Sequence, residues 1–121
     1  MDNQNEIKTN NTINEILTAV VQFYNTQYGE LLEQVWLFGS KARGDDNPAS
    51  DIDIMVIVND NAYIDKSLGN NTKKHTLAMD IFSKYNALIS PMEYPLTDFN
   101  NDRIPLHRNV KKEGVLYYGK S

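Results

Sequence analysis

The sequence of 121 residues contains no cysteine, which excludes a disulfide framework and any metal site built on thiolates. It also lacks an apolar run of membrane-spanning length. The first eleven residues are polar and rich in asparagine, unlike a secretory signal peptide. We therefore expect a cytoplasmic protein with no membrane association.

Positive charge is scarce as well. Twelve lysines and arginines against sixteen aspartates and glutamates leave a formal net charge of −4, whereas proteins that coat nucleic acids carry a basic patch and a high pI. General nucleic-acid binding is therefore not expected. A nucleotide substrate is still compatible with this charge, because Mg²⁺ can bridge acidic side chains and phosphates.

The length and a hydrophobic content of 40% are typical of one small globular domain. We expect a flexible polar leader over residues 1–10 and a single domain over 11–121. Helical spacing of apolar residues and strand-like runs alternate along that domain, which predicts an α/β layer structure. The expected helices cover residues 12–28, 72–85 and 105–113, and the expected strands cover 35–38, 51–58, 87–92 (interrupted at Pro91) and 115–118. Polar connections are expected over 45–50, 59–71 and 98–102, the second with the alternative of a weak helix.

The most informative local pattern joins two of these strands. Gly39 and Ser40 follow the first strand, and Asp51 and Asp53 open the second. Side chains at i and i+2 of a strand point to the same face, so the two carboxylates converge on one spot. Carboxylate oxygens suit Mg²⁺, and a glycine and a hydroxyl at a strand end suit phosphate oxygens. Lys41 and Arg43 add cations that can contact phosphate.

Each part of this pattern has a commoner explanation when it stands alone. Gly-Ser is usually a turn, Asp-x-Asp is frequent in proteins, and Lys41 and Arg43 can be solvated surface charges. Their order, with Gly-Ser after one strand and Asp-x-Asp opening an apolar second strand, favours a metal and triphosphate site. Nucleotidyl transfer needs such a site, because metal-bound carboxylates on a rigid element hold the triphosphate in line for attack.

The stretch from Gly39 to Gly44 together with Ser50-Asp51-Ile52-Asp53 closely resembles the minimal nucleotidyltransferases (MNT) of the DNA polymerase β-like superfamily. The closing residues 112–117 are similar to the end of such domains. This resemblance implies a small mixed sheet with helices packed on it, a triphosphate held by Gly39 and Ser40, and Mg²⁺ held by Asp51 and Asp53. It also implies a helical HEPN toxin as partner, onto which some such antitoxins transfer AMP from ATP.

One feature of the family is missing from its usual place. A third carboxylate normally stands on a later strand, expected here between Tyr85 and Glu93, and no aspartate occurs there. Asn86 stands in the usual position, and Glu93 is the nearest acid, so Glu93 is kept as a third catalytic candidate. His75 and His107 lack a second ligand at metal-binding spacing, which favours surface or lightly paired histidines.

Two functions remain open at this point. The first is a Mg²⁺-dependent nucleotidyltransferase that modifies a protein partner or another copy of this chain. The second is an antitoxin-like subunit that neutralises its partner by contact and at most holds nucleotide. The intact Gly39-Ser40 and Asp51-x-Asp53 pairs favour the enzyme, and the absent third aspartate favours the binding subunit. The sequence does not identify the nucleoside.

Overall fold

A four-stranded mixed sheet organises the chain, whose computed structural model describes residues 2–44, 51–65 and 71–119. The strands are β1 (Leu32–Phe38), β2 (Ile52–Val58), β3 (Ile89–Pro95) and β4 (Val115–Gly119), in the order β3-β2-β1-β4. β1 is antiparallel to β2 and to β4, whereas β2 and β3 are parallel. The parallel pair needs a crossover connection, which contains α3 (Asp60–Ile64) and α4 (Asn71–Tyr85). The expected α/β class with a small mixed sheet is confirmed.

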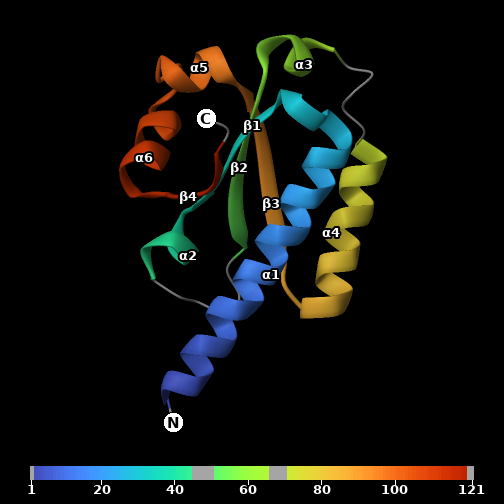
Figure 1. Cartoon of the computed structure of the whole chain (residues 1–121). Coiled ribbons are helices and arrows are strands. Elements are labelled where there is room, and N and C mark those ends of the chain that lie inside the picture. The colour runs from blue at the N-terminus through green and yellow to red at the C-terminus, as the bar shows by residue number, and fades with distance from the viewer. Residues whose placement is uncertain (1, 45–50, 66–70, 120–121) are drawn as a thin grey trace.

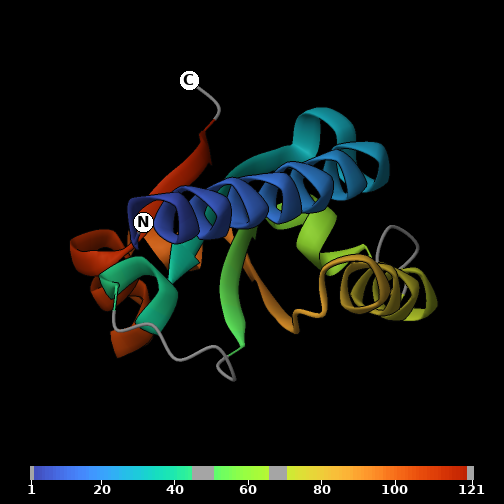
Figure 2. The same ribbon diagram turned by 90° about the horizontal axis from the view of Figure 1, so that it is seen from below.

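Helices cover both faces of the sheet (Figures 1 and 2). The long helix α1 (Asp2–Tyr28) and α4 lie on one face, and α5 (Leu96–Asn100) and α6 (Pro105–Glu113) lie on the other. β2 is buried on both faces, as its apolar sequence predicts. Ile54 and Val56 belong to the core under α1, while Met55 and Ile57 pack with Phe99 of α5.

Helix α1 begins well before the expected start. It runs from Asp2, so residues 2–10, expected to be a flexible leader, are helical, and Thr12 lies inside the helix instead of capping it. The polar first residues contain no proline or glycine, so nothing in them stops a helix from continuing toward the N-terminus. Within the described ranges, no helix combines the length and the apolar character needed to cross a bilayer.

Two expectations in the second half of the chain were wrong. β3 continues through Pro91 to Pro95, because an edge strand needs no N–H donor on its outer side. Residues 96–100 form the helix α5, which overlaps the polar connection expected over 98–102. The mostly polar sequence gave no sign of this helix, although its Phe99 is buried against the sheet.

The remaining connections follow the expected pattern closely. Residues 29–31 form a 3₁₀ turn after α1, and residues 60–64 form α3 inside the expected loop or weak helix. The helix α6 starts at Pro105 and ends before Gly114, after which β4 closes the sheet. The expected connection over 45–50 lies outside the described residues.

Candidate functional site

The two halves of the sequence pattern meet where β1 ends and β2 begins. Gly39 follows β1, and residues Ser40–Arg43 form the single helical turn α2. Asp51 directly precedes β2, and Asp53 pairs across the antiparallel ladder with Phe38, the residue before Gly39. A hairpin-like return of the chain therefore brings together residues that stand more than ten positions apart. The structure places Gly39, Ser40, Lys41, Arg43, Asp51 and Asp53 at this one end of the sheet.

Gly39 packs directly against the carboxylate of Asp53. A Cβ atom at position 39 would lie 2.3 Å from Asp53 Oδ2, so the Asp53 carboxylate would have to move to make room for it. The backbone of Gly39 has φ of 76° and ψ of −155°, a region that is essentially restricted to glycine. Arg43 N–H donates to the Gly39 carbonyl at 3.2 Å, which closes the turn. The backbone conformation therefore requires glycine here, and any Cβ would also displace the Asp53 carboxylate.

The surroundings of Asp53 disfavour its negative charge. Partial burial and the neighbouring Asp51 carboxylate both raise the pKa of Asp53, and the Arg43 guanidinium only partly opposes this. Two carboxylates that repel each other at a strand rim form a donor set that a divalent cation would neutralise. Their oxygen-only chemistry fits a hard cation such as Mg²⁺.

The strand next to Asp53 does not supply a third carboxylate. Ser90 of β3 stands opposite Asp53 in the parallel register. Asn86, expected in place of the usual third acid, ends α4 with φ of 53° and is not part of β3. Within residues 2–44, 51–65 and 71–119, no group of three or more histidine, aspartate or glutamate side chains is arranged to hold a metal.

Glu93, the third catalytic candidate, lies elsewhere. Glu93 of β3 lies opposite Val56 of β2, and it stands three residues after Ser90, the residue opposite Asp53. Its side chain therefore points to the other face of the sheet. There it accepts hydrogen bonds from the hydroxyls of Tyr24 at 2.9 Å and Tyr28 at 3.1 Å, and it pairs with Lys74 at 3.0 Å. The structure does not bring Glu93 together with Asp51 and Asp53.

The two histidines differ from each other. His75 is exposed on α4, as expected. His107 is not a surface residue: it is 1% exposed, and its ring packs edge-on against Tyr94 and Phe99. Its place on α6 three residues before Val110 explains this burial, because both residues face the core under the sheet.

A small cavity adjoins the Gly39 turn. Its volume is about 210 Å³, and it lies between the end of β1, α2 and one side of α6. The lining residues are Phe38, Gly39, Arg43, Leu106, Asn109, Val110 and Glu113. Sequence reasoning did not find the contribution of α6, because its residues lie more than sixty positions from Gly39 and form no motif of their own.

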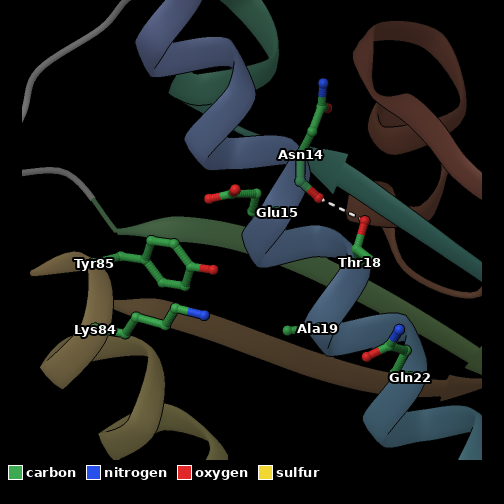
Figure 3. Close-up of a pocket in the computed structure, with 7 residues that line it drawn as sticks. All are labelled: Asn14, Glu15, Thr18, Ala19, Gln22, Lys84 and Tyr85. Atoms are coloured by element: carbon green, nitrogen blue, oxygen red, sulfur yellow. Dashed lines mark hydrogen bonds between the residues drawn. The ribbon is translucent and has the colours of Figure 1, made fainter.

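A larger groove of about 550 Å³ lies on the other face of the sheet, between α1 and α4. Figure 3 shows Lys84 and Tyr85 pointing from α4 toward Glu15 and Gln22 of α1. The Lys84 ammonium lies over the Tyr85 ring, 5.3 Å from its centre. Asp53 belongs to the sheet face that carries α6, so this groove is separate from the aspartate pair.

Comparisons with known proteins agree on one family. The model of the family described as polymerase beta, nucleotidyltransferase, matches residues 22–121. A protein of Methanocaldococcus jannaschii, named provisionally as a protein adenylyltransferase, is 34% identical over 86 residues, which cover 69% of this chain and 83% of that protein.

Solved structures share the fold. A chain in the crystal structure of a toxin–antitoxin complex with AMP-PNP has a TM-score of 0.59 at 20% identity, covering 86% of this chain and 73% of that one. A chain in the complex of tri-AMPylated Shewanella oneidensis HEPN toxin with its MNT antitoxin has a TM-score of 0.52 at 20% identity, with 89% and 71% covered.

Proposed function

Because the chain belongs to the polymerase beta nucleotidyltransferase family, we propose that it transfers AMP from ATP to a protein partner in a Mg²⁺-dependent reaction. The partner we propose is a HEPN-type toxin, which this chain neutralises as its antitoxin. The observation that carries the proposal is the contact of Gly39 with Asp53, in which the carboxylate fills the space of any Cβ at position 39. That contact supports the proposal, because the turn that we assign to phosphate lies directly beside a carboxylate that we assign to Mg²⁺.

Mg²⁺ would be held by Asp51 and Asp53, and when bound it would neutralise the triphosphate and activate the attacking oxygen. The chain itself performs the remaining tasks. Gly39 allows close approach of phosphate to the backbone, Ser40 contacts the β- and γ-phosphates, and Lys41 and Arg43 add further phosphate contacts. These contacts hold the α-phosphorus in line with the acceptor.

In the reaction, a hydroxyl oxygen of the acceptor forms a bond to the α-phosphorus of ATP. The bond from that phosphorus to the bridging oxygen breaks, pyrophosphate leaves, and the hydroxyl proton passes to solvent. We assign the acceptor hydroxyl to a protein, in line with the name of the archaeal relative and with the AMPylated toxin in the similar complex.

A second function is favoured by one observation. Ser90 stands on β3 where a third carboxylate would face Asp53, and a hydroxyl cannot bind a cation as strongly as a carboxylate does. A subunit that holds Mg-ATP and neutralises its partner by contact alone would need no third acid.

Intact-mass spectrometry separates the two functions. The chain is incubated with Mg²⁺, ATP and a candidate HEPN partner, beside the variants Asp53→Asn and Asp80→Asn. Asp80 is exposed on α4 and serves as the matched control. We expect the partner to gain the mass of AMP with wild type and Asp80→Asn but not with Asp53→Asn. Tight binding of the partner without any mass gain would overturn the enzyme and support the contact antitoxin.

A further inference from the structure

The cavity beside Gly39 has the composition of a site for a flat, polar-edged molecule. Phe38, Leu106 and Val110 provide apolar walls, and Val110 is 1% exposed. Asn109 and Glu113 stand four positions apart on α6, so they are neighbours on one side of the helix. Together they offer an amide donor, an amide acceptor and a carboxylate acceptor at the rim of the cavity.

We propose that this cavity binds the nucleobase of the nucleotide, and that Asn109 and Glu113 select a base with an exocyclic amino group beside a ring-nitrogen acceptor, as in adenine. The inference rests on the proposed nucleotide transfer and deepens it by naming the residues that choose the substrate.

Continuity with the phosphate-binding turn supports a base in this cavity. Gly39 lines the cavity and also contacts Asp53, and Arg43 lines it while its guanidinium acts on the Asp53 carboxylate. The base is joined through the ribose to the α-phosphate, so it lies near the turn that holds the phosphates. The acceptor hydroxyl instead approaches from the side opposite the leaving pyrophosphate.

Size and the carboxylate of Glu113 argue against other parts of the substrate in this cavity, although the cation of Arg43 also lines it. A volume of about 210 Å³ is below that of a typical site for a whole drug-sized ligand. The carboxylate of Glu113 would repel a phosphate, and the walls of Phe38 and Leu106 would leave its oxygens without partners. A base instead places its faces against the apolar walls and its polar edge toward α6.

The polar edge explains the selectivity. Asparagine pairs in a bidentate manner with the amino group and adjacent ring nitrogen of adenine, and a carboxylate accepts from exocyclic amino groups. Hypoxanthine carries an oxygen in place of the amino group, so Glu113 would face an acceptor. A matched bidentate pair is worth about 1–3 kcal/mol of discrimination, which corresponds to roughly ten- to hundredfold in affinity.

Titration calorimetry with Mg-ATP, Mg-ITP and Mg-tripolyphosphate tests the assignment on the full chain. We expect ATP to bind roughly ten- to hundredfold more tightly than ITP. Asn109→Ala and Glu113→Ala should each weaken ATP binding about tenfold and leave tripolyphosphate binding unchanged. Leu106→Trp, which fills the cavity, should remove the ATP preference, and Asn100→Ala on α5 is the control that changes nothing. Far-UV circular dichroism confirms that each variant is folded.

Other results would overturn the inference. Equal binding of ATP and ITP while AMP transfer is intact contradicts the base site and leaves the proposed function standing. A raised KM for the acceptor, with ATP affinity unchanged in Asn109→Ala, would assign the cavity to the acceptor instead. Absence of Mg-ATP binding to the wild-type chain would overturn both the site and the proposed function.

Discussion

Gly39 is the residue whose replacement has the clearest consequence. Its backbone conformation is restricted to glycine, and a methyl group there would overlap the Asp53 carboxylate. We predict that Gly39→Ala lowers nucleotidyl transfer by at least about a hundredfold, because a small displacement of a catalytic group is that costly. The strained backbone should also cost about 1–3 kcal/mol of unfolding free energy. Urea titration and the intact-mass assay measure the two effects.

Gly44 provides a control for the Gly39 substitution. It also has positive φ, at 77°, but among the described residues no atom beyond its chain neighbours lies within 4 Å of a Cβ built on it. Gly44→Ala should therefore show a backbone cost without displacing Asp53, and transfer should stay within a few-fold of wild type. Equal losses of activity in the two variants would mean that the contact with Asp53 is not what matters.

At the scale of residues, the sequence indicated which candidate residues lie together better than it indicated what surrounds them. Gly39, Ser40, Asp51 and Asp53 are close in the chain, so strand periodicity was enough to bring them together. Glu93 was misplaced because its distance from Asp53 along β3, and hence its face of the sheet, depends on the register of two strands that are far apart in sequence.

At the scale of elements, Glu93 connects α1, β3 and α4. Burial, reinforced by the Glu93 carboxylate, raises the pKa of Tyr24 and Tyr28, so both hydroxyls stay protonated and donate to Glu93. Lys74 adds its ammonium from α4. A carboxylate on β3 that accepts from donors on α1 and α4 fixes the relative positions of the three elements.

We predict that Glu93→Gln lowers the unfolding free energy by about 2–3 kcal/mol, since hydrogen bonds to a charged group are the stronger ones. Tyr28→Phe should cost about 1 kcal/mol. Urea titration checks both values. Because Glu93 lies on the face away from Asp53, the transfer rate of the folded Glu93→Gln variant should remain within a few-fold of wild type. A collapse of that rate with stability retained would restore Glu93 as a catalytic residue.

Asp60 links the ends of two parallel strands. It begins α3 after β2, and its carboxylate accepts from the N–H of Thr97 at 3.0 Å and from the Thr97 hydroxyl, at the start of α5 after β3. The hydroxyl bond and then the backbone bond hold the pKa of Asp60 below its usual value.

This shift predicts a pH dependence of stability. The stabilisation is complete above the ordinary aspartate pKa of about 3.9, and it is lost as the pH falls through the lower folded-state pKa of Asp60. Wild type should therefore lose more unfolding free energy than Asp60→Asn when the pH falls from about 6 to about 3. Thr97→Val should likewise make the unfolding free energy depend less on pH than it does in wild type. Parallel curves for the three proteins would contradict the link.

The periodicity of apolar residues predicted most elements, and it failed where a helix is very short or a strand contains proline. The apolar run of β2 and the helical spacing of α4 are strong signals, and both elements appear as expected. α5 has five residues, too few for a helical period to be visible. Pro91 suggested a break because proline lacks the N–H that a strand donates to its neighbour. The missing N–H has no effect in β3, because no strand within the described residues pairs with it on that side.

At the scale of the whole molecule, the two edges of the sheet are protected differently. β3 carries Pro91 and Pro95, which cannot donate to a further strand. β4 contains neither proline nor charge, and its Val115 and Leu116 are each 48% exposed. Strand addition is therefore easier at β4, although its five residues limit the strength of any pairing.

We predict that self-association at high protein concentration uses the β4 edge. Leu116→Lys should shift sedimentation-velocity profiles toward monomer, because lysine on an edge strand opposes pairing. Met79→Lys is the matched control, since Met79 is a comparably exposed apolar residue on α4, away from the edge. Equal profiles for wild type and Leu116→Lys would exclude this edge as the contact.

The order of the strands is the property that the sequence conveyed least. An α/β layer structure follows from alternating elements, but the position of β4 beside β1 depends on contacts between segments about eighty residues apart. The cavity beside Gly39 depends on the same closure, because α6 is held over β1 by the chain that enters β4. The sequence predicted α6 as a helix but indicated neither its buried face, which carries His107, nor its neighbour.

The direction of β4 has a practical consequence. β4 runs antiparallel to β1, so Gly119 lies opposite Gln34 and away from the end of β1 that carries Gly39 (Figure 1). A tether attached after the last strand would anchor the molecule to a sensor chip or resin by the end remote from the aspartates. Ligand solutions could then reach Asp51 and Asp53 unobstructed. A tether at the start of α1 would instead hold the end of the molecule that carries the aspartates against the support.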